Sequence, residues 1–153
     1  MTDVHNPERR SKNMRAIRSK NTTPELLIRK LLFSLGFRFR LHVKSLPATP
    51  DIVLPKYRTA IFVHGCFWHG HDCYFFKLPK TRRDFWQAKI DANRQRDLRG
   101  QDMLILARWR VVTVWECALK GRLKQDPSVL AEQLSSLIRE DRADAFCAEI
   151  RHR

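Results

Sequence analysis

The sequence predicts a single α/β domain in which helices flank a central mixed β-sheet. The chain has 153 residues, of which 43% are hydrophobic, which suits one domain with its own core. Short apolar runs typical of strands alternate with longer segments of helical periodicity. Five glycines and seven prolines are too few for a loop-dominated chain. These observations together favour a compact sheet covered by helices.

The first helix is predicted to begin at Thr23-Pro24-Glu25. Threonine suits the N-cap and proline the first helical position. Gly36 suits the position just after the helix, where a left-handed backbone is needed. We expect the buried face of this helix to consist of Leu27, Ile28, Leu31, Leu32 and Leu35.

Four segments are predicted to be strands. Residues 37–43 alternate apolar and basic side chains, as a half-buried strand does. Residues 51–54 form a short buried strand that opens with Asp51, and residues 59–64 are its expected hairpin partner. Residues 109–115 are predicted to form a further central strand.

Two more helices follow. One is expected from Asp84 to about Leu106, with Gly100 weakening its middle, and the other from Asp126-Pro127. Their expected inward residues are Ile90, Met103, Leu104 and Leu106 in the first and Val129, Leu130, Leu134, Leu137 and Ile138 in the second. The last dozen residues carry little signal.

The chain is strongly basic, with 30 Lys+Arg against 16 Asp+Glu and a formal charge of +14. Such an excess predicts a polyanionic partner, with nucleic acid as the first candidate and a membrane surface as the second. We expect residues 1–20 to form a basic DNA-binding arm, residues 21–140 the folded domain and residues 141–153 a tail. No apolar leader or membrane span is apparent, so we expect a cytoplasmic protein.

Cysteines and histidines are concentrated between residues 61 and 73. In a reducing compartment, clustered cysteines predict a metal site before a disulfide, and zinc prefers four N or S ligands. The expected zinc ligands are Cys66, His71, Cys73 and Cys117, with His64 and His69 as competitors for the histidine position. The alternative is inert buried thiols, which is also our interpretation of Cys147.

A second constellation combines carboxylates with imidazoles. If the hairpin is correct, Asp51 and His64 lie near the same end of the sheet, and Glu25 approaches from the first helix. Carboxylates at such a position suit Mg²⁺, and His69 is the candidate general base. The alternative is that Asp51 is an ordinary capping or turn residue.

Aromatic residues lie beside cations in the same region. Phe67, Trp68 and Trp86 are accompanied by Lys77, Lys80, Arg82, Arg83 and Lys89. Exposed rings among cations stack on bases or wedge into base steps while the cations hold phosphates. The alternative is that Trp86 packs in the core and Phe67 covers the zinc.

Several short motifs stand out: SKNMRAI at 11–17, PD at 50–51, HGCFWH at 64–69, the His71/Cys73 pair, FW at 85–86 and VWECALKG at 114–121. Together they resemble those of the very-short-patch repair endonucleases, a family of DNA mismatch endonucleases. The resemblance extends over about residues 3–140. It implies a restriction-endonuclease-like fold and nicking of double-stranded DNA 5′ of the mispaired thymine in T:G mismatches from deaminated 5-methylcytosine.

The resemblance also implies roles for individual residues. Asp51 and the backbone carbonyl of Val63 would bind Mg²⁺, His69 would be the base, and Glu25 and His64 would hold metal-bound water. The zinc ligands would be Cys66, His71, Cys73 and Cys117. Phe67, Trp68 and Trp86 would intercalate beside the mismatch, Lys89 would contact DNA, and the arm around Met14 would clamp the minor groove.

The sequence departs from the family pattern at three positions. Val63 replaces an expected threonine, which a carbonyl ligand tolerates but a hydroxyl ligand would not. Gly70 and Asp72 replace expected histidines, which leaves His71 with fewer competitors.

The sequence therefore predicts a Mg²⁺-dependent, zinc-stabilised mismatch endonuclease. The resemblance implies a monomer acting in a CT(A/T)GG context. We also expect mismatch-repair proteins among its partners. The alternatives are a non-catalytic zinc-stabilised DNA-binding module and a restriction-type nuclease with another target.

Overall fold

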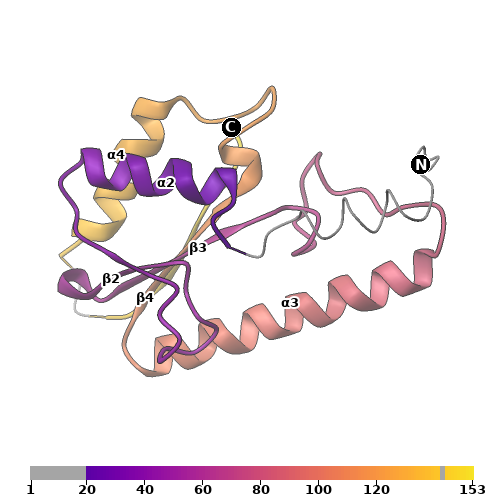
Figure 1. The fold of residues 1–153 in the computed structure, drawn as a ribbon, viewed down its shortest axis with the longest axis horizontal. Helices are drawn as coiled ribbons and strands as arrows, with labels where there is room; N and C mark the ends of the chain where they lie inside the picture. The colour runs from indigo at the N-terminus through magenta and orange to yellow at the C-terminus, as the bar shows by residue number, and fades with distance from the viewer. Residues whose placement is uncertain (1–19, 142–143) are drawn as a thin grey trace.

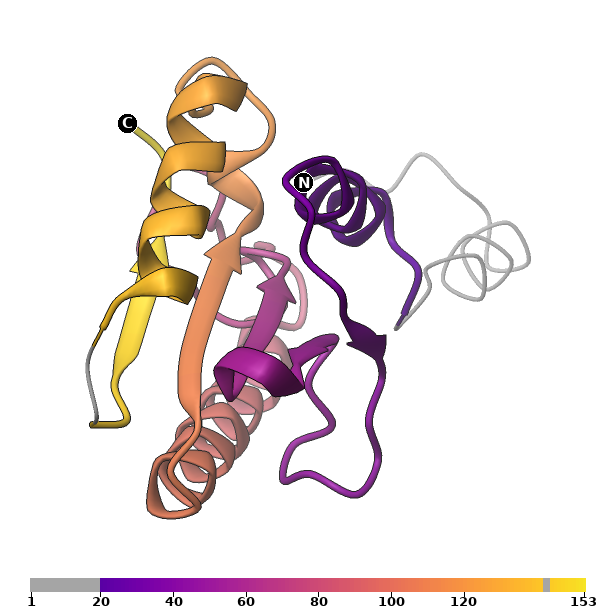
Figure 2. The same ribbon diagram turned by 90° about the vertical axis from the view of Figure 1, so that its left-hand side faces the viewer.

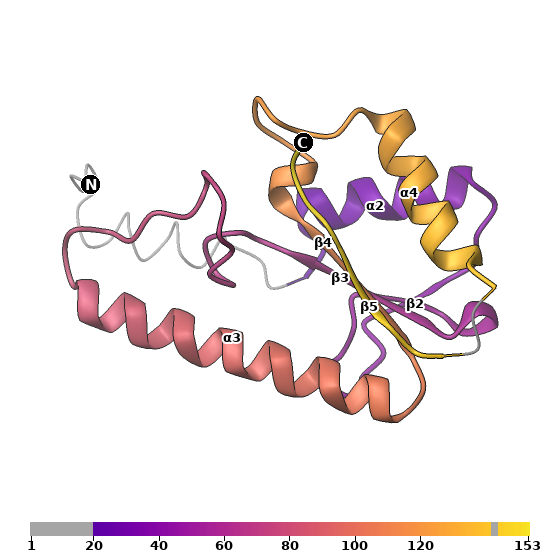
Figure 3. The same cartoon turned by 180° about the vertical axis from the view of Figure 1, so that it is seen from behind.

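The computed structural model of the protein describes residues 20–141 and 144–153, which form one mixed five-stranded sheet between two layers of helices (Figures 1 and 3). The helices are α2 (Thr23–Ser34), α3 (Arg83–Leu106) and α4 (Pro127–Arg139). The strands are β1 (Arg40–Leu41), β2 (Ile52–Leu54), β3 (Thr59–His64), β4 (Arg110–Trp115) and β5 (Cys147–Ile150). The predicted α/β class and mixed sheet are confirmed.

The strands lie in the order β1-β2-β3-β4-β5. The first three are antiparallel neighbours, whereas β3, β4 and β5 run parallel. The α3 crossover joins β3 to β4 and lies on one face of the sheet, and α4 joins β4 to β5 on the other face beside α2 (Figure 1). The hairpin predicted between residues 51–54 and 59–64 is confirmed, with Ile52 opposite Ile61.

The helix ends follow from local chemistry. The side chain of Thr22 caps α2 by accepting a hydrogen bond from the Glu25 N–H at 3.4 Å, so the cap lies one residue before the predicted Thr23. Gly36 has a φ of +88°, the left-handed conformation expected after the helix. Asp126 caps α4 through the Ser128 N–H.

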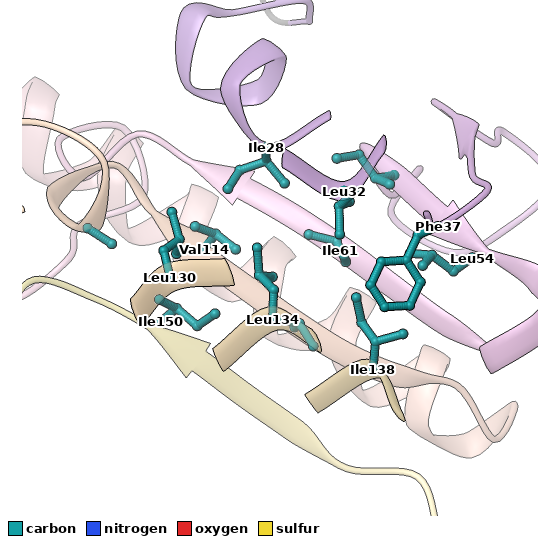
Figure 4. Packing of buried hydrophobic residues seen from close by; sticks show 13 residues of the cluster. Ile28, Leu32, Phe37, Leu54, Ile61, Val114, Leu130, Leu134, Ile138 and Ile150 are labelled. Carbon is teal, nitrogen blue, oxygen red and sulfur yellow. The ribbon is translucent and has the colours of Figure 1, made fainter. Parts of the chain in front are cut away.

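Alternate residues of the strands divide between two cores, as the twofold periodicity of a strand requires. Ile61 and Val114 face α2 and α4, where they pack with Ile28, Leu32, Leu130, Leu134 and Ile138 (Figure 4). Ala60, Phe62 and Val111 face α3 and pack against Leu104. Both faces of the sheet are therefore covered.

Gly100 allows α3 to pack closely against the loop before β2. A Cβ atom at this position would lie 2.4 Å from the Cβ of Ala48. The glycine that weakens the helix in isolation is thus required by its packing.

Four residues predicted to face inward are exposed: Leu27, Val129, Met103 and Leu106. Each helix residue turns the side chain by about 100°, so Leu106 points roughly 200° away from the buried Leu104. The prediction for Leu106 was wrong because Leu104 and Leu106 cannot share one covered face.

The ends of the sheet also differ from the prediction. Within residues 37–43, only Arg40–Leu41 pair as a strand, with β2. The tail contributes β5, which the sequence did not indicate and which forms the outer edge beside β4 (Figure 2). Cys147 begins this strand and is exposed, which corrects its interpretation as a buried thiol. None of the helices in residues 20–141 and 144–153 combines the length and apolar character needed to cross a membrane.

Candidate active site and metal centre

The β2–β3 hairpin places Asp51 beside the end of β3. Asp51 immediately precedes β2, and its Oδ2 accepts a hydrogen bond from the Val63 N–H at 2.8 Å. The register of the hairpin, set by the apolar strands, therefore brings a carboxylate to the segment that leads into the cysteine- and histidine-rich loop.

Glu25 approaches Asp51 from the first turn of α2 and is 1% exposed. It is paired with Arg29, lies 3.2 Å from His42 Nε2, and accepts the Asn21 N–H at 3.0 Å. Glu25, His42 and Asp51 each offer a ligand atom, and these atoms lie within 4.8 Å of one another. We call these three residues the carboxylate site.

The donors of the carboxylate site fit a divalent cation. Burial raises the pKa of Asp51 from 3.8 to about 7, and the neighbouring Glu25 adds to this, while the Val63 N–H opposes it. Two carboxylates in a poorly solvated site repel each other, and a cation between them relieves this repulsion. The single Arg29 lies on Glu25 and does not by itself balance both groups.

A histidine–aspartate pair lies beside the carboxylate site. His69 Nδ1 is 2.6 Å from the Oδ2 of Asp97, which projects from α3. When Nδ1 carries the proton toward Asp97, the lone pair is on Nε2, as a general base requires. Sequence reasoning missed Asp97, because a lone aspartate within a charged helix carries no distinguishing signal.

His64 stacks on His69 with ring centroids 3.7 Å apart and an interplanar angle of 2°. Burial lowers the pKa of His64 to about 3, and the adjacent His69 contributes in the same direction. His64 is therefore neutral at physiological pH. Its buried Nδ1 has no hydrogen-bond partner among the residues that the structure describes.

Asp51, His64, His69 and Asp97 line one pocket of about 250 Å³, whereas Glu25 and His42 lie outside its lining. Its walls come from the loop before β2, the end of β3 and α3, and include Asp51, Val63, His64, His69, Arg96, Asp97 and Gln101. The pocket thus combines a carboxylate at a strand end with an oriented imidazole, the arrangement needed to hydrolyse a phosphodiester with a metal ion.

A separate group consists of Cys66, His71, Cys73 and Cys117, whose ligand atoms also lie within 4.8 Å of one another. We call it the thiol cluster. Cys117 Sγ lies 3.6 Å from His71 Nδ1, and Cys66 and Cys117 are fully buried. Three cysteines and one histidine are a usual tetrahedral zinc set. Of the three histidines that competed for this position, His71 is the one beside the cysteines.

The chemistry of the thiol cluster also fits a cation. Burial raises the pKa of the Cys66 and Cys117 thiols, because their thiolates lose hydration. A bound zinc ion would compensate the thiolate charge.

The C-terminal segment closes over the thiol cluster. The His152 N–H donates to Cys117 Sγ at 3.4 Å, and Arg151 binds the Asp72 side chain at 3.0 Å. On the other side, the His71 ring stacks on Trp115 at 4.0 Å. The tail therefore covers the cluster, a contact that nothing in its sequence indicated.

Phe67, Trp68 and Trp86 form a half-buried aromatic cluster, in which the ring centroids lie 5.2–5.8 Å apart. Lys89 Nζ lies 5.8 Å from the Trp68 ring and 6.0 Å from the Trp86 ring. Trp86 packs against Phe67 and Trp68 and is not part of the main core. Met14 falls outside the described residues.

A family profile described as DNA mismatch endonuclease Vsr matches residues 2–75. The chain is 48% identical over 145 residues to the DNA mismatch endonuclease Vsr of Escherichia coli, covering 95% of this chain and 93% of that protein. The chain belongs to the Vsr DNA mismatch endonuclease family.

Other relatives carry a different name. The chain is 54% identical over 136 residues to the type II nicking enzyme V.XorIIP of Xanthomonas oryzae pv. oryzae, covering 84% of this chain and 100% of the relative. It is 44% identical over 140 residues to the type II nicking enzyme V.NmeAIP of Neisseria meningitidis, covering 92% of this chain and 96% of that relative. The predicted resemblance and the endonuclease class are confirmed.

Gly70, a departure from the expected Vsr pattern, has a structural reason in this chain. Its φ is +61°, and a Cβ atom would lie 2.6 Å from Ile90 Cγ2 and 2.7 Å from Arg94 Cδ. The loop between Cys66 and Cys73 therefore packs directly on α3 at this glycine.

Proposed function

We propose that this Vsr-family endonuclease nicks double-stranded DNA 5′ of the mispaired thymine in T:G mismatches, with catalytic Mg²⁺ and structural Zn²⁺. The observation that carries the proposal is the single pocket that contains Asp51, His64, His69 and Asp97. A DNA-binding module without catalysis would need no such combination.

Asp51 and the Val63 carbonyl are the proposed Mg²⁺ ligands. The Val63 N–H already points at Asp51. In an extended strand, the N–H and C=O of one residue lie on the same side, which supports a carbonyl directed toward the same space. A main-chain ligand also makes valine acceptable at this position. When bound, Mg²⁺ would stabilise the negative charge that develops on the scissile phosphate.

His69 is the proposed base. Asp97 holds Nδ1, so Nε2 can take a proton from the water that attacks phosphorus. Glu25 and neutral His64 would hydrogen-bond the other water molecules of the site.

The thiol cluster is the proposed zinc site. It joins the loop after β3 to the end of β4, because Cys66 and Cys73 lie in the former and Cys117 in η2 (Glu116–Ala118). Bound zinc would therefore hold the loop that carries His69 at a fixed position beside Asp51.

The aromatic cluster is the proposed mismatch sensor. Phe67, Trp68 and Trp86 would wedge into the base stack while Lys89 contacts phosphates. Wedging costs less free energy at a mispaired step, which would favour T:G over paired DNA. We further propose that residues 1–20, including Met14, form an arm that clamps the duplex, and that residues 21–140, completed by β5 of the tail, form the endonuclease domain of a monomer.

A strand-specific nicking assay with Mg²⁺ tests the function. Two end-labelled duplexes differ only in one pair, T:G or C:G, within CTAGG. We expect one cut, 5′ of the mismatched thymine, and none in the C:G duplex. Cutting of both duplexes would indicate a nuclease with another target. Tight binding without cutting in several divalent metals would overturn the catalytic proposal.

A further inference from the structure

His42 lies between the two carboxylates of the carboxylate site and has no role in the mechanism described so far. Its Nε2 is 3.2 Å from Glu25 Oε2, and its Nδ1 is 4.0 Å from Asp51 Oδ1. The imidazole therefore presents one nitrogen to each carboxylate.

The backbone holds His42 in this position. The His42 N–H donates to the Asp51 carbonyl at 3.1 Å, extending the β1–β2 pairing by one residue. His42 has a φ of +48°, a left-handed conformation that histidine adopts more readily than most residues. Its side chain is 19% exposed, so the site is partly open to solvent on this side.

The two nitrogen distances imply different interactions. At 3.2 Å, Nε2 is within hydrogen-bonding distance of Glu25, whereas 4.0 Å between Nδ1 and Asp51 is too long for a hydrogen bond. Two donors that each lie roughly 2.0–2.2 Å from a shared ion are separated by about 3–4 Å. The Nδ1–Asp51 gap is therefore compatible with an ion between them.

The contact with Glu25 matches the usual surroundings of a metal-bound histidine. Such a histidine donates its second ring N–H to a carboxylate, which fixes the tautomer and increases the basicity of the ligating nitrogen. Arg29 lies on the same Glu25 oxygen and 3.0 Å from Nε2. A guanidinium can only donate, so this contact places the lone pair on Nε2 and the proton on Nδ1. An ion at Nδ1 requires the opposite tautomer, in which Nε2–H is donated to Glu25 and Arg29 binds Glu25 alone.

We propose that His42 Nδ1 is a nitrogen ligand of the ion held by Asp51, and that Glu25 orients the His42 ring by accepting a hydrogen bond from its other nitrogen, Nε2. The inference rests on the proposed function, in which Asp51 binds the catalytic ion. First-row transition ions accept imidazole more readily than Mg²⁺ does, with Mn²⁺ the weakest binder among them, whereas Mg²⁺ prefers oxygen. The site should therefore bind Mn²⁺ considerably more tightly, relative to Mg²⁺, than an all-oxygen site does.

Electron paramagnetic resonance of Mn²⁺ on the zinc-loaded full-length protein tests the proposal, because Zn²⁺ is diamagnetic. We expect the pulsed spectrum to show ¹⁴N modulation from one coordinated imidazole, which changes to the ¹⁵N pattern when histidine is ¹⁵N-labelled. His42→Gln should remove the modulation and weaken Mn²⁺ binding by about tenfold or more. By calorimetry, Mg²⁺ binding should change by less than about threefold, because Mg²⁺ gains little from a nitrogen ligand.

The other outcomes separate the two proposals. Wild-type Mn²⁺ spectra without ¹⁴N modulation would overturn the role of His42, and this result needs no variant. Modulation that survives in His42→Gln but vanishes in His64→Gln would assign the ligand to His64 and also overturn it. Asp51→Asn should abolish specific Mn²⁺ binding. If it does not, the metal site of the proposed function fails as well.

Discussion

The carboxylate site and the thiol cluster both consist of metal-binding side chains, but they differ in how completely the protein shields them from solvent. Cys66 and Cys117 are fully buried, and the tail and Trp115 cover their cluster. Asp51 has a side chain 17% exposed and lines a pocket with His69. Structural metal sites are closed by protein ligands, whereas catalytic sites retain an open position. The difference predicts that one site stabilises the protein and the other acts on substrate.

Asp51→Asn should separate the two sites most sharply. We expect nicking of a T:G duplex to fall at least about 10³-fold, because one metal ligand and its charge are lost. Zinc content should remain at one ion per chain, and binding of mismatched DNA should persist. Single-turnover nicking and a filter-binding assay measure these quantities. Full nicking by this variant would remove Asp51 from the mechanism.

Cys117→Ser should act on stability. Loss of one ligand of a closed zinc site is expected to lower the free energy of unfolding by about 3–5 kcal/mol and to reduce bound zinc well below one ion per chain. Denaturant unfolding and metal analysis provide the measurements. Cys147→Ser is the matched control, since Cys147 is exposed and outside the cluster. Equal effects of both variants would contradict a specific role for the thiol cluster.

Asp97→Asn should reduce nicking by about 10- to 100-fold with little change in zinc content or DNA affinity. The carboxylate orients His69, and loss of such a partner weakens a site without removing its reacting groups. An unchanged nicking rate would show that His69 needs no partner on α3.

The smallest expected effect concerns pH and the metal-free carboxylate site. The pKa of Asp51 is raised from 3.8 to about 7 by burial, so the folded protein binds this proton more tightly than the unfolded chain. The wild type should therefore lose stability relative to Asp51→Asn as pH rises from about 4 to 7, with a slope of at most about 1.4 kcal/mol per pH unit. Unfolding of the zinc-loaded proteins in Mg²⁺-free buffer at several pH values measures the difference in free energy of unfolding between wild type and Asp51→Asn. A difference that does not vary with pH would mean that burial does not raise the pKa of Asp51.

Much of the fold could be predicted from local patterns. The bounds of β3, and those of α3 and β4 to within about a residue, follow from apolar runs and turn residues. The three thiols of the thiol cluster follow from residue types, whereas the structure distinguished His71 from its competitors His64 and His69. In contrast, β5 pairs four residues whose pattern resembles that of any exposed tail, and only its neighbour β4 makes it a strand.

The sequence by itself determined which segments are helices and strands and which residue types were available as ligands. Only the tertiary structure decided which residues meet. Asp97 reaches His69 because α3 presents one particular face to the end of β3, and His42 reaches Asp51 because β1 pairs with β2. Arg151 and His152 reach the loop and η2 that carry the thiol cluster because β5 runs parallel to β4. Such contacts depend on helix rotation and strand register, which are set by packing across the whole domain and not by neighbouring residues in the chain.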